Sequence, residues 1–313
     1  MKEKLISAVV SVYNEESVLP AFYEETTKVL ENCPWDYELI FVNDGSQDNS
    51  MSLLREFAKN NNKVKVVNFS RNFGHEAAMI AGIDHSQGDG IVCLDADLQH
   101  PPENIPKIIE KFENGFDVIN MVRTKNEDAG LIKRITSKMF YLVLNMMSSV
   151  KFENNASDFF AVSRVVADVL KKEYRENIRF LRGFVQNLGF SKTTIEYEAR
   201  KREAGESKYS IRKLLKFSLN ALFSFSDMPL KLGIYSGLIV ALCGFILMVY
   251  TIVNRVCFNV PSGYSTIIVA MCFMFAVLLI IIGIIGEYIA ILFAEIKGRP
   301  IYIVREFLNG ENE

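Results

Sequence analysis

The sequence has few cysteines and lacks the spacings that would give them a structural role. Its 313 residues include five cysteines, none in a C-x-x-C pair: Cys33, Cys93, Cys243, Cys257 and Cys272. We therefore expect neither a disulfide framework nor a zinc site, and a reducing compartment is the simpler interpretation. The net charge of −2 implies no overall electrostatic attraction to nucleic acids.

Two other patterns are missing near the N-terminus. No G-x-G-x-x-G follows the first expected strand, Leu5–Val12, which disfavours a dinucleotide-binding fold. The first residues also lack the apolar stretch of a secretory signal, so we expect no signal peptide.

Long apolar runs are present instead in the C-terminal third. No charge occurs from Leu232 to Asn254 or from Val256 to Gly286, although Pro261-Ser-Gly263 interrupts the second run. Each run supplies the roughly 20 residues that span a bilayer, and the alternative is a buried hairpin in a soluble protein. We predict a two-helix transmembrane hairpin at residues 230–293. Basic residues flank both runs, so the positive-inside rule places both termini in the cytoplasm: Lys208, Arg212, Lys213, Lys216, Lys231, Lys297, Arg299 and Arg305.

Residues 1–125 alternate between strand and helix patterns, which is typical of a doubly wound, mostly parallel α/β sheet. The expected strands are Leu5–Val12, Tyr37–Val42, Val64–Phe69, Ile91–Leu94 and Val118–Val122. The expected helices are Val18–Leu30, Ser50–Ala58 with Ser50 as N-cap, Gly74–Ile83 and Glu103–Phe112.

Two further helical segments, 131–150 and 210–229, combine basic residues with aromatic and aliphatic ones. Such helices beside membrane spans indicate interfacial helices on an anionic leaflet, and the alternative is ordinary core-facing amphipathicity. The expected organisation is a cytoplasmic domain at 1–209 containing the 131–150 helix, a juxtamembrane helix at 210–229, the hairpin at 230–293 and a cytoplasmic tail at 294–313.

The segment Ile91–Glu103 carries the clearest chemical signal. A short apolar strand ends at Asp95 and Asp97, and two prolines then favour a helix start. Two carboxylates with the nearby amide of Gln99 are hard oxygen donors, which suit Mg²⁺ or Mn²⁺ on a diphosphate. The alternative is an acidic loop that merely ends a strand.

Polar groups also follow two earlier strands, Tyr13-Asn-Glu15 and Asp44. In a doubly wound sheet these strand ends converge, so they could hold a nucleoside beside the metal. Taken singly, Glu15 could favour a helix N-terminus and Asp44 a turn. Basic residues flank this edge in the sequence: Arg123, Arg134, Arg200, Lys201, Arg202 and Lys208. The segment 205–209, which contains Lys208, could form a lid over phosphates. For the basic run 200–202, the alternative is a solvated surface.

Six motifs follow one another along the chain: Val9-Val-Ser-Val-Tyr-Asn-Glu-Glu16, Val42-Asn-Asp-Gly-Ser46, Ser70-Arg-Asn-Phe-Gly74, Leu94-Asp-Ala-Asp-Leu-Gln99, Ala156-Ser-Asp-Phe159 and Arg202-Glu-Ala-Gly-Glu-Ser-Lys-Tyr209. This ordered set, over nearly the whole chain, resembles family-2 glycosyltransferases with a GT-A fold, of the polyprenyl-phosphate type. Dolichol-phosphate mannosyltransferases and bacterial undecaprenyl-phosphate (bactoprenol) glucosyl- or aminoarabinosyltransferases are similar.

The resemblance implies a role for each motif. Nucleoside contacts would come from Tyr13, Glu15 and Asp44, and metal contacts from Asp95, Asp97 and Gln99. The lipid phosphate would be received by Arg123, Arg134 and Ser137, the donor phosphates covered by Arg202 and Lys208, and the sugar approached by Asp158. The family commonly has Asp where this chain has His100, and we expect little effect of that departure.

The implied reaction is inverting transfer of a sugar from a nucleotide-diphosphate sugar to polyprenyl phosphate at the cytoplasmic face of a bacterial inner membrane. UDP-glucose is the first expectation; the alternatives are UDP-N-acetylglucosamine, GDP-mannose and UDP-aminoarabinose. A flippase, a downstream glycosyltransferase and a second copy of the chain are conceivable partners. A processive synthase is disfavoured because Trp35, the sole tryptophan, is not in a Gln-x-x-Arg-Trp segment. A non-enzymatic scaffold is disfavoured because all the acids remain.

Overall fold

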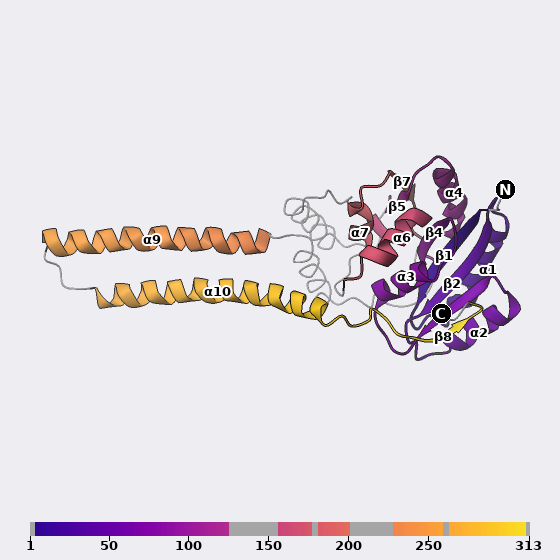
Figure 1. Cartoon of the computed structure of the whole chain (residues 1–313), viewed down its shortest axis with the longest axis horizontal. Coiled ribbons are helices and arrows are strands. Elements are labelled where there is room, and N and C mark those ends of the chain that lie inside the picture. The colour runs from indigo at the N-terminus through magenta and orange to yellow at the C-terminus, as the bar shows by residue number, and fades with distance from the viewer. Residues whose placement is uncertain (1–3, 125–155, 177–180, 201–227, 259–262, 311–313) are drawn as a thin grey trace. The chain divides into compact units, whose positions relative to one another are not determined.

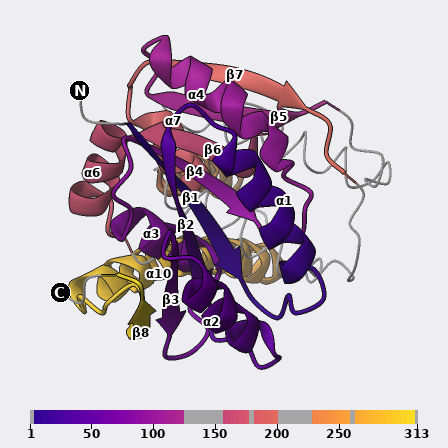
Figure 2. The same ribbon diagram turned by 90° about the vertical axis from the view of Figure 1, so that its right-hand side faces the viewer.

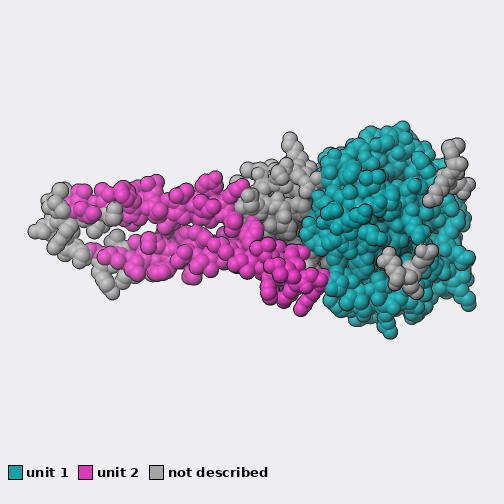
Figure 3. Space-filling model, viewed as in Figure 1, with its two compact units in different colours: residues 1–145, 150–215, 300–313 teal, residues 146–149, 216–299 magenta. Residues whose placement is uncertain are grey.

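The computed structural model describes residues 4–124, 156–176, 181–200, 228–258 and 263–310. The chain divides into two compact units (Figure 3). The sheet unit comprises residues 1–145, 150–215 and 300–313, and the helical unit comprises residues 146–149 and 216–299.

The sheet unit is built on one mixed sheet. Its strands are β1 (Leu5–Val12), β2 (Asp36–Asn43), β3 (Val64–Phe69), β4 (Gly90–Asp95), β5 (Val118–Arg123), β6 (Ala156–Ser163), β7 (Lys192–Tyr197) and β8 (Val304–Leu308). They lie in the order β7-β5-β6-β4-β1-β2-β3-β8 (Figure 2). Strands β3, β2, β1 and β4 are parallel, in the order of a doubly wound sheet. Because β6 and β8 are antiparallel to their neighbours, the prediction of a mostly parallel sheet holds for this half, and the whole sheet is mixed.

Helices cover both faces of this sheet. They are α1 (Leu19–Glu31), α2 (Ser50–Asn60), α3 (His75–Asp84), α4 (Ile105–Glu113), α6 (Arg164–Glu173) and α7 (Leu181–Asn187), with the short 3₁₀ helix η1 (Pro102–Asn104) before α4. Helices α1, α2 and α4 lie on one face, and α3, α6 and α7 on the other (Figures 1 and 2). Consecutive strand residues such as Val9 and Val10 are both fully buried, so both faces need this cover.

Most expected elements of residues 4–123 are confirmed to within two residues. Two details were wrong. Helix α4 begins at Ile105 rather than Glu103, because the prolines start the short 3₁₀ helix first. Ser50 is the first residue of α2 rather than its N-cap, which is Asn49; the Ser50 hydroxyl instead accepts the backbone N–H of Glu15 at 3.0 Å.

Several elements beyond residue 124 were not predicted, namely β6, β7, β8, α6 and α7. The two expected interfacial helices, at 131–150 and 210–229, lie outside the described residues.

The helical unit contains two long helices, α9 (Met228–Phe258) and α10 (Tyr264–Ile296). Among the described residues, Phe273–Ile296 alone is long and apolar enough to cross a membrane, while the apolar part of α9 at Gly233–Leu247 is shorter. By this criterion, one of the two expected membrane spans is found among the described residues, on α10, and the other is not. Helix α9 packs against α10, where a Cβ added at Gly233 would lie 3.6 Å from the side chain of Ile281.

The segment after α10 returns to the sheet unit, as residues 300–308, which we call the C-terminal strap. Its strand β8 pairs with β3 and is the edge strand on that side of the sheet. Just before β8, the Tyr302 ring stacks on the Phe69 ring, with 5.2 Å between the ring centroids. The Tyr302 hydroxyl donates to the Asp84 carboxylate at 2.6 Å, and Arg175 donates to both oxygens of that carboxylate at 2.9 Å. The strap therefore joins β3 to the end of α3.

We expect Tyr302→Phe to lower stability by about 1–2 kcal/mol, because it removes one hydrogen bond to a buried carboxylate and keeps the stacking. Thermal unfolding of the detergent-solubilised chain measures the change. Arg55→Ala is the matched control; it removes the exposed ion pair with Glu306 and should cost about 0.5 kcal/mol or less. Equal melting temperatures for Tyr302→Phe and the parent would contradict this role of the hydroxyl.

Candidate active site

The expected convergence of three strand ends is confirmed. Val12 at the end of β1 pairs with Asn43 of β2, and Ser11 pairs with Asp95 of β4. Tyr13 and Asp44, which follow directly, therefore lie at the same sheet edge as Asp95. In open α/β sheets this edge, between β1 and β4 where the strand order reverses, is where ligands bind.

Backbone contacts hold the loops after β1 and β2 together. The backbone N–H of Asn14 donates to the Ser46 hydroxyl at 3.0 Å. The side-chain amide oxygen of Asn14 accepts the backbone N–H of Gln47 at 2.8 Å. Asn14 has a φ of +55°, a value that Asn tolerates better than most residues. Tyr13 and Glu15, which flank Asn14, are half-buried in this joined pair of loops.

Asp44 organises the loop that leads into α3. Its side chain is almost fully buried, and its two carboxylate oxygens accept the N–H groups of Phe73 and Gly74 at 2.6 and 3.0 Å. Burial raises the pKa of Asp44 despite these two donors. The carboxylate thus has a structural task in addition to the nucleoside contact expected from the sequence.

Gly45 makes the next step of this loop possible. Its φ is +69°, and an added Cβ would lie 2.6 Å from backbone atoms of Arg71 and Asn72. Both the conformation and the close approach need glycine.

We expect Gly45→Ala to lower the free energy of unfolding by about 1–3 kcal/mol, because the main chain at Arg71 and Asn72 must shift. Gly115→Ala is the control for conformation alone, since Gly115 has a φ of +83° with nothing within 4 Å. Equal losses of melting temperature in the two variants would contradict the argument from close approach.

Asp95 is the last residue of β4, and Asp97 and Gln99 lie on the turn between β4 and η1. One oxygen of Asp97 accepts the backbone N–H of Gln99 at 3.1 Å, and Leu98 between them has a φ of +59°. A branched residue in this conformation is uncommon and indicates a turn that the surroundings hold in place.

The donor set of this turn fits a divalent ion. The described residues contain no cluster of three or more His, Cys, Asp or Glu side chains that could bind a metal unaided. Mg²⁺ is usually held by one or two carboxylates together with substrate phosphates, and two carboxylates with one amide match that requirement.

Two histidines that were not predicted as site residues flank Asp95. Nδ1 of His75 lies 3.7 Å from one Asp95 oxygen and 2.8 Å from the Ser11 hydroxyl. Burial lowers the pKa of His75, but the charges of Asp95 and Asp158 outweigh it, so the net shift is upward. Nδ1 of His100 lies 3.6 Å from the other oxygen. The expectation that His100 has little effect does not fit this central, fully buried position. A histidine at the first residue of α3, just after the Ser70–Gly74 motif, and one after the acidic pair were the available signals.

Further charged side chains lie close to these histidines. Asp158 of β6 pairs with Arg182 of α7 at 3.0 Å, and Glu76 accepts the N–H of Leu181 at 2.8 Å. Burial raises the pKa of Asp158, but Arg182 and His75 outweigh it and the net shift is downward. Burial raises the pKa of Glu76, and the nearby Asp158 charge adds to this.

Arg123 ends β5 beside this cluster. Its Nε donates to the Tyr197 hydroxyl at 2.9 Å, and its Nη2 lies 3.2 Å from Nε2 of His100. Arg200, by contrast, forms ion pairs with Glu25 and Glu103. The other expected phosphate-binding residues lie outside the described residues: Arg134, Ser137, Lys201, Arg202 and Lys208.

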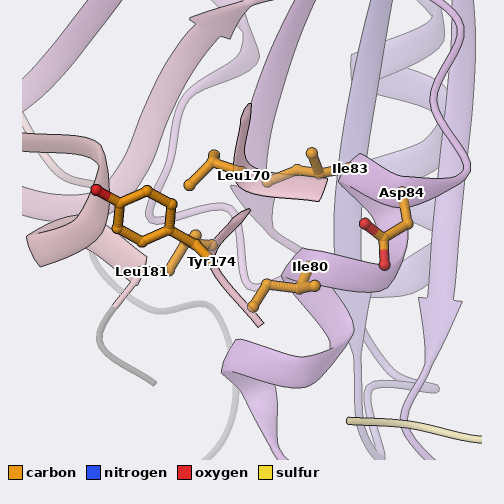
Figure 4. Close-up of a pocket in the computed structure, with 6 residues that line it drawn as sticks. All are labelled: Ile80, Ile83, Asp84, Leu170, Tyr174 and Leu181. Carbon is orange, nitrogen blue, oxygen red and sulfur yellow. The ribbon is translucent and has the colours of Figure 1, made fainter. Parts of the chain in front are cut away.

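A small pocket on the other side of α3 is an apolar packing seam rather than a part of this site (Figure 4). Side chains from α3, from α6 and its C-terminal end, and from the start of α7 line it: Ile80, Ile83, Asp84, Leu170, Tyr174 and Leu181. The pocket lies where α3, whose first two residues are His75 and Glu76, packs beside α6 and α7, and α7 carries Arg182.

The chain is similar over nearly its whole length to known glycosyltransferases. The chain is 41% identical over 308 residues to the uncharacterized glycosyltransferase YkcC of Bacillus subtilis, covering 98% of this chain and 95% of that one. It is 38% identical over 306 residues to the bactoprenol glucosyl transferase of Shigella phage SfII, covering 97% and 99%. A crystal structure of glucosyl-3-phosphoglycerate synthase from Mycobacterium tuberculosis is 17% identical, with a TM-score of 0.48 over 70% of this chain and 78% of that one.

Family models match both units. The GtrB C-terminal hairpin matches residues 228–292. Glycosyl transferase family 2 matches residues 7–203, most of the described sheet unit including the acidic turn. The chain belongs to glycosyl transferase family 2 and is a glycosyltransferase.

Proposed function

We propose that this chain transfers a sugar, glucose first, from a UDP-sugar to the phosphate of a polyprenyl lipid at the cytoplasmic face of a bacterial membrane. The observation that carries the proposal is the 38% identity, over 97% of the chain, to a protein named bactoprenol glucosyl transferase. The acidic turn beside Arg123 supports it, because one sheet edge then offers groups for both a donor diphosphate and an acceptor phosphate.

The roles at this edge follow from its chemistry. Tyr13, Glu15 and Asp44 hold the nucleoside, and Asp95, Asp97 and Gln99 hold Mg²⁺ or Mn²⁺. When bound, the metal neutralises charge on the leaving diphosphate. Arg123 binds the acceptor phosphate together with Arg134 and Ser137. Arg202 and Lys208 close over the donor phosphates, and Asp158 lies near the sugar.

The reaction needs no general base. A phosphate monoester is already ionised near neutral pH, so its oxygen can attack the anomeric carbon directly while the bond to the diphosphate breaks. Catalysis then consists of in-line positioning and charge stabilisation. An attack from the face opposite the leaving group inverts the anomeric configuration.

We propose that both long helices cross the membrane as a hairpin. Their apolar side chains are exposed in the helical unit; Leu238 on α9 and Leu279 on α10 are 63% and 66% exposed. Such continuous apolar surface is stable only against lipid or protein. The match of residues 228–292 to a hairpin family supports two crossings, which would leave both termini in the cytoplasm.

Sugar transfer can be tested with the full chain in lipid nanodiscs containing undecaprenyl phosphate. We expect label from UDP-glucose to enter the lipid fraction when Mn²⁺ or Mg²⁺ is present. Parallel reactions with UDP-N-acetylglucosamine, GDP-mannose and UDP-aminoarabinose identify the preferred sugar. Polymeric product would indicate a processive synthase. An absence of transfer from any donor, together with no metal-dependent binding of UDP or GDP, would favour a scaffold.

A further inference from the structure

His100 occupies a fully enclosed position between the two halves of the candidate site. Its side chain has no exposed surface. The ring stacks on Phe159 of β6 at 5.2 Å and meets the Tyr197 ring edge-on at 6.3 Å. These two rings also contact each other at 5.3 Å, so the imidazole has little freedom to turn.

Each ring nitrogen of His100 faces a different half of the site. Nδ1 accepts the backbone N–H of Asp95 at 3.0 Å, and Nε2 lies 3.2 Å from Nη2 of Arg123. Because Nδ1 accepts this hydrogen bond, it carries no proton, so the ring proton is on Nε2 and Nε2 cannot accept from Arg123. The imidazole therefore restricts the position of the Arg123 guanidinium by direct contact. The Tyr197 hydroxyl also holds Arg123, because it accepts a hydrogen bond from the Arg123 Nε at 2.9 Å.

We propose that His100 is a positioning residue that sets the separation between the metal-binding turn at Asp95 and the acceptor-binding Arg123. The inference rests on the proposed function, in which these two groups hold the leaving diphosphate and the attacking phosphate. In-line displacement requires the attacking phosphate and the leaving diphosphate to be held at a defined separation. An error of about 1 Å in that separation can lower the rate about 100-fold. One rigid ring that touches both sides fixes that distance.

Two substitutions separate the two contacts. In His100→Asn the amide oxygen can take the place of Nδ1, so the Asp95 N–H stays paired while the contact with Arg123 is lost. In His100→Gln the amide reaches the position of Nε2, so the side next to Arg123 is filled while the Asp95 N–H loses its acceptor. Each variant should therefore impair a different half of the site.

The test measures Mn²⁺ binding in the presence of saturating UDP, and separately the KM for undecaprenyl phosphate, with the full chain in nanodiscs. We expect His100→Asn to keep Mn²⁺ affinity within twofold and to raise the acceptor KM about tenfold or more. We expect His100→Gln to weaken Mn²⁺ binding about tenfold or more, because the metal-binding residue Asp95 loses the acceptor of its backbone N–H, and to change the acceptor KM much less.

His85→Asn is the matched control. His85 lies at the C-terminal end of α3 against Phe307, at 4.8 Å between ring centroids, and should leave both constants unchanged. If both His100 variants keep both constants, or lose both to the same extent, the positioning role is wrong. Parent protein that binds no Mn²⁺ with UDP and transfers no sugar would instead overturn the proposed function, and this inference with it.

Discussion

Asp97→Ala should abolish sugar transfer, with a loss of about 10³-fold or more, equivalent to about 4 kcal/mol of transition-state stabilisation. Asp97 supplies one of two carboxylates on the turn after β4, and the leaving diphosphate develops negative charge as its bond breaks. Asp97→Asn removes the negative charge but keeps the hydrogen bond within the turn, because the amide oxygen can still accept the Gln99 N–H that Asp97 accepts at 3.1 Å. Transfer of labelled sugar to undecaprenyl phosphate measures the effect.

The controls for Asp97 are acids in other environments. Asp158→Asn should keep measurable turnover, because an amide oxygen can still accept a hydrogen bond from Arg182. Asp168→Ala, at a half-exposed acid of α6, should leave transfer unchanged. Full activity in Asp97→Ala, with or without added metal, would show that the metal assignment is wrong.

Asp44→Ala should lower stability by about 2–4 kcal/mol and also weaken UDP binding. Removing the carboxylate leaves the part-buried N–H groups of Phe73 and Gly74 without their acceptor, and an unpaired donor that water does not reach costs about 1–3 kcal/mol. The loop that enters α3 would then lose its anchor at the nucleoside side of the site. Thermal unfolding and calorimetric titration with UDP measure the two effects.

Asp44→Asn distinguishes the structural task from the nucleoside contact. The amide retains one acceptor oxygen, so we expect it to recover part of the lost stability. If UDP affinity falls in Asp44→Ala but stability does not, the carboxylate acts on the nucleotide alone. If neither changes, both assignments of Asp44 are wrong.

The first half of the fold could be predicted from the sequence because its signals are local. Leu5–Val12 and Val64–Phe69 are apolar runs bounded by polar turns, and both strands match their predicted bounds. Strand β7 could not be found this way: exposed residues alternate with partly or fully buried ones along Lys192–Tyr197, and the segment has no apolar run. Strand β8 is likewise half-exposed, and it is a strand because it pairs with β3, which is distant in sequence.

The candidate site shows the same division. Asp44 and Asp95 follow strands, so strand order alone brings them to one edge. His100 is different, because its role depends on a left-handed residue, Leu98, that turns the chain back beneath Asp95 and on Phe159 of β6, a strand that was not predicted. Contacts between segments far apart in the chain leave no local pattern.

The C-terminal strap has a consequence for biosynthesis. Because β8 follows α9 and α10 in the chain, the ribosome completes both long helices before it makes the strand that covers β3. Until then the edge of β3 offers unpaired backbone groups, which are a template for association with other chains. Completion of the sheet therefore waits for both long helices, so a nascent chain that stalls within α9 or α10 also has an unfinished sheet.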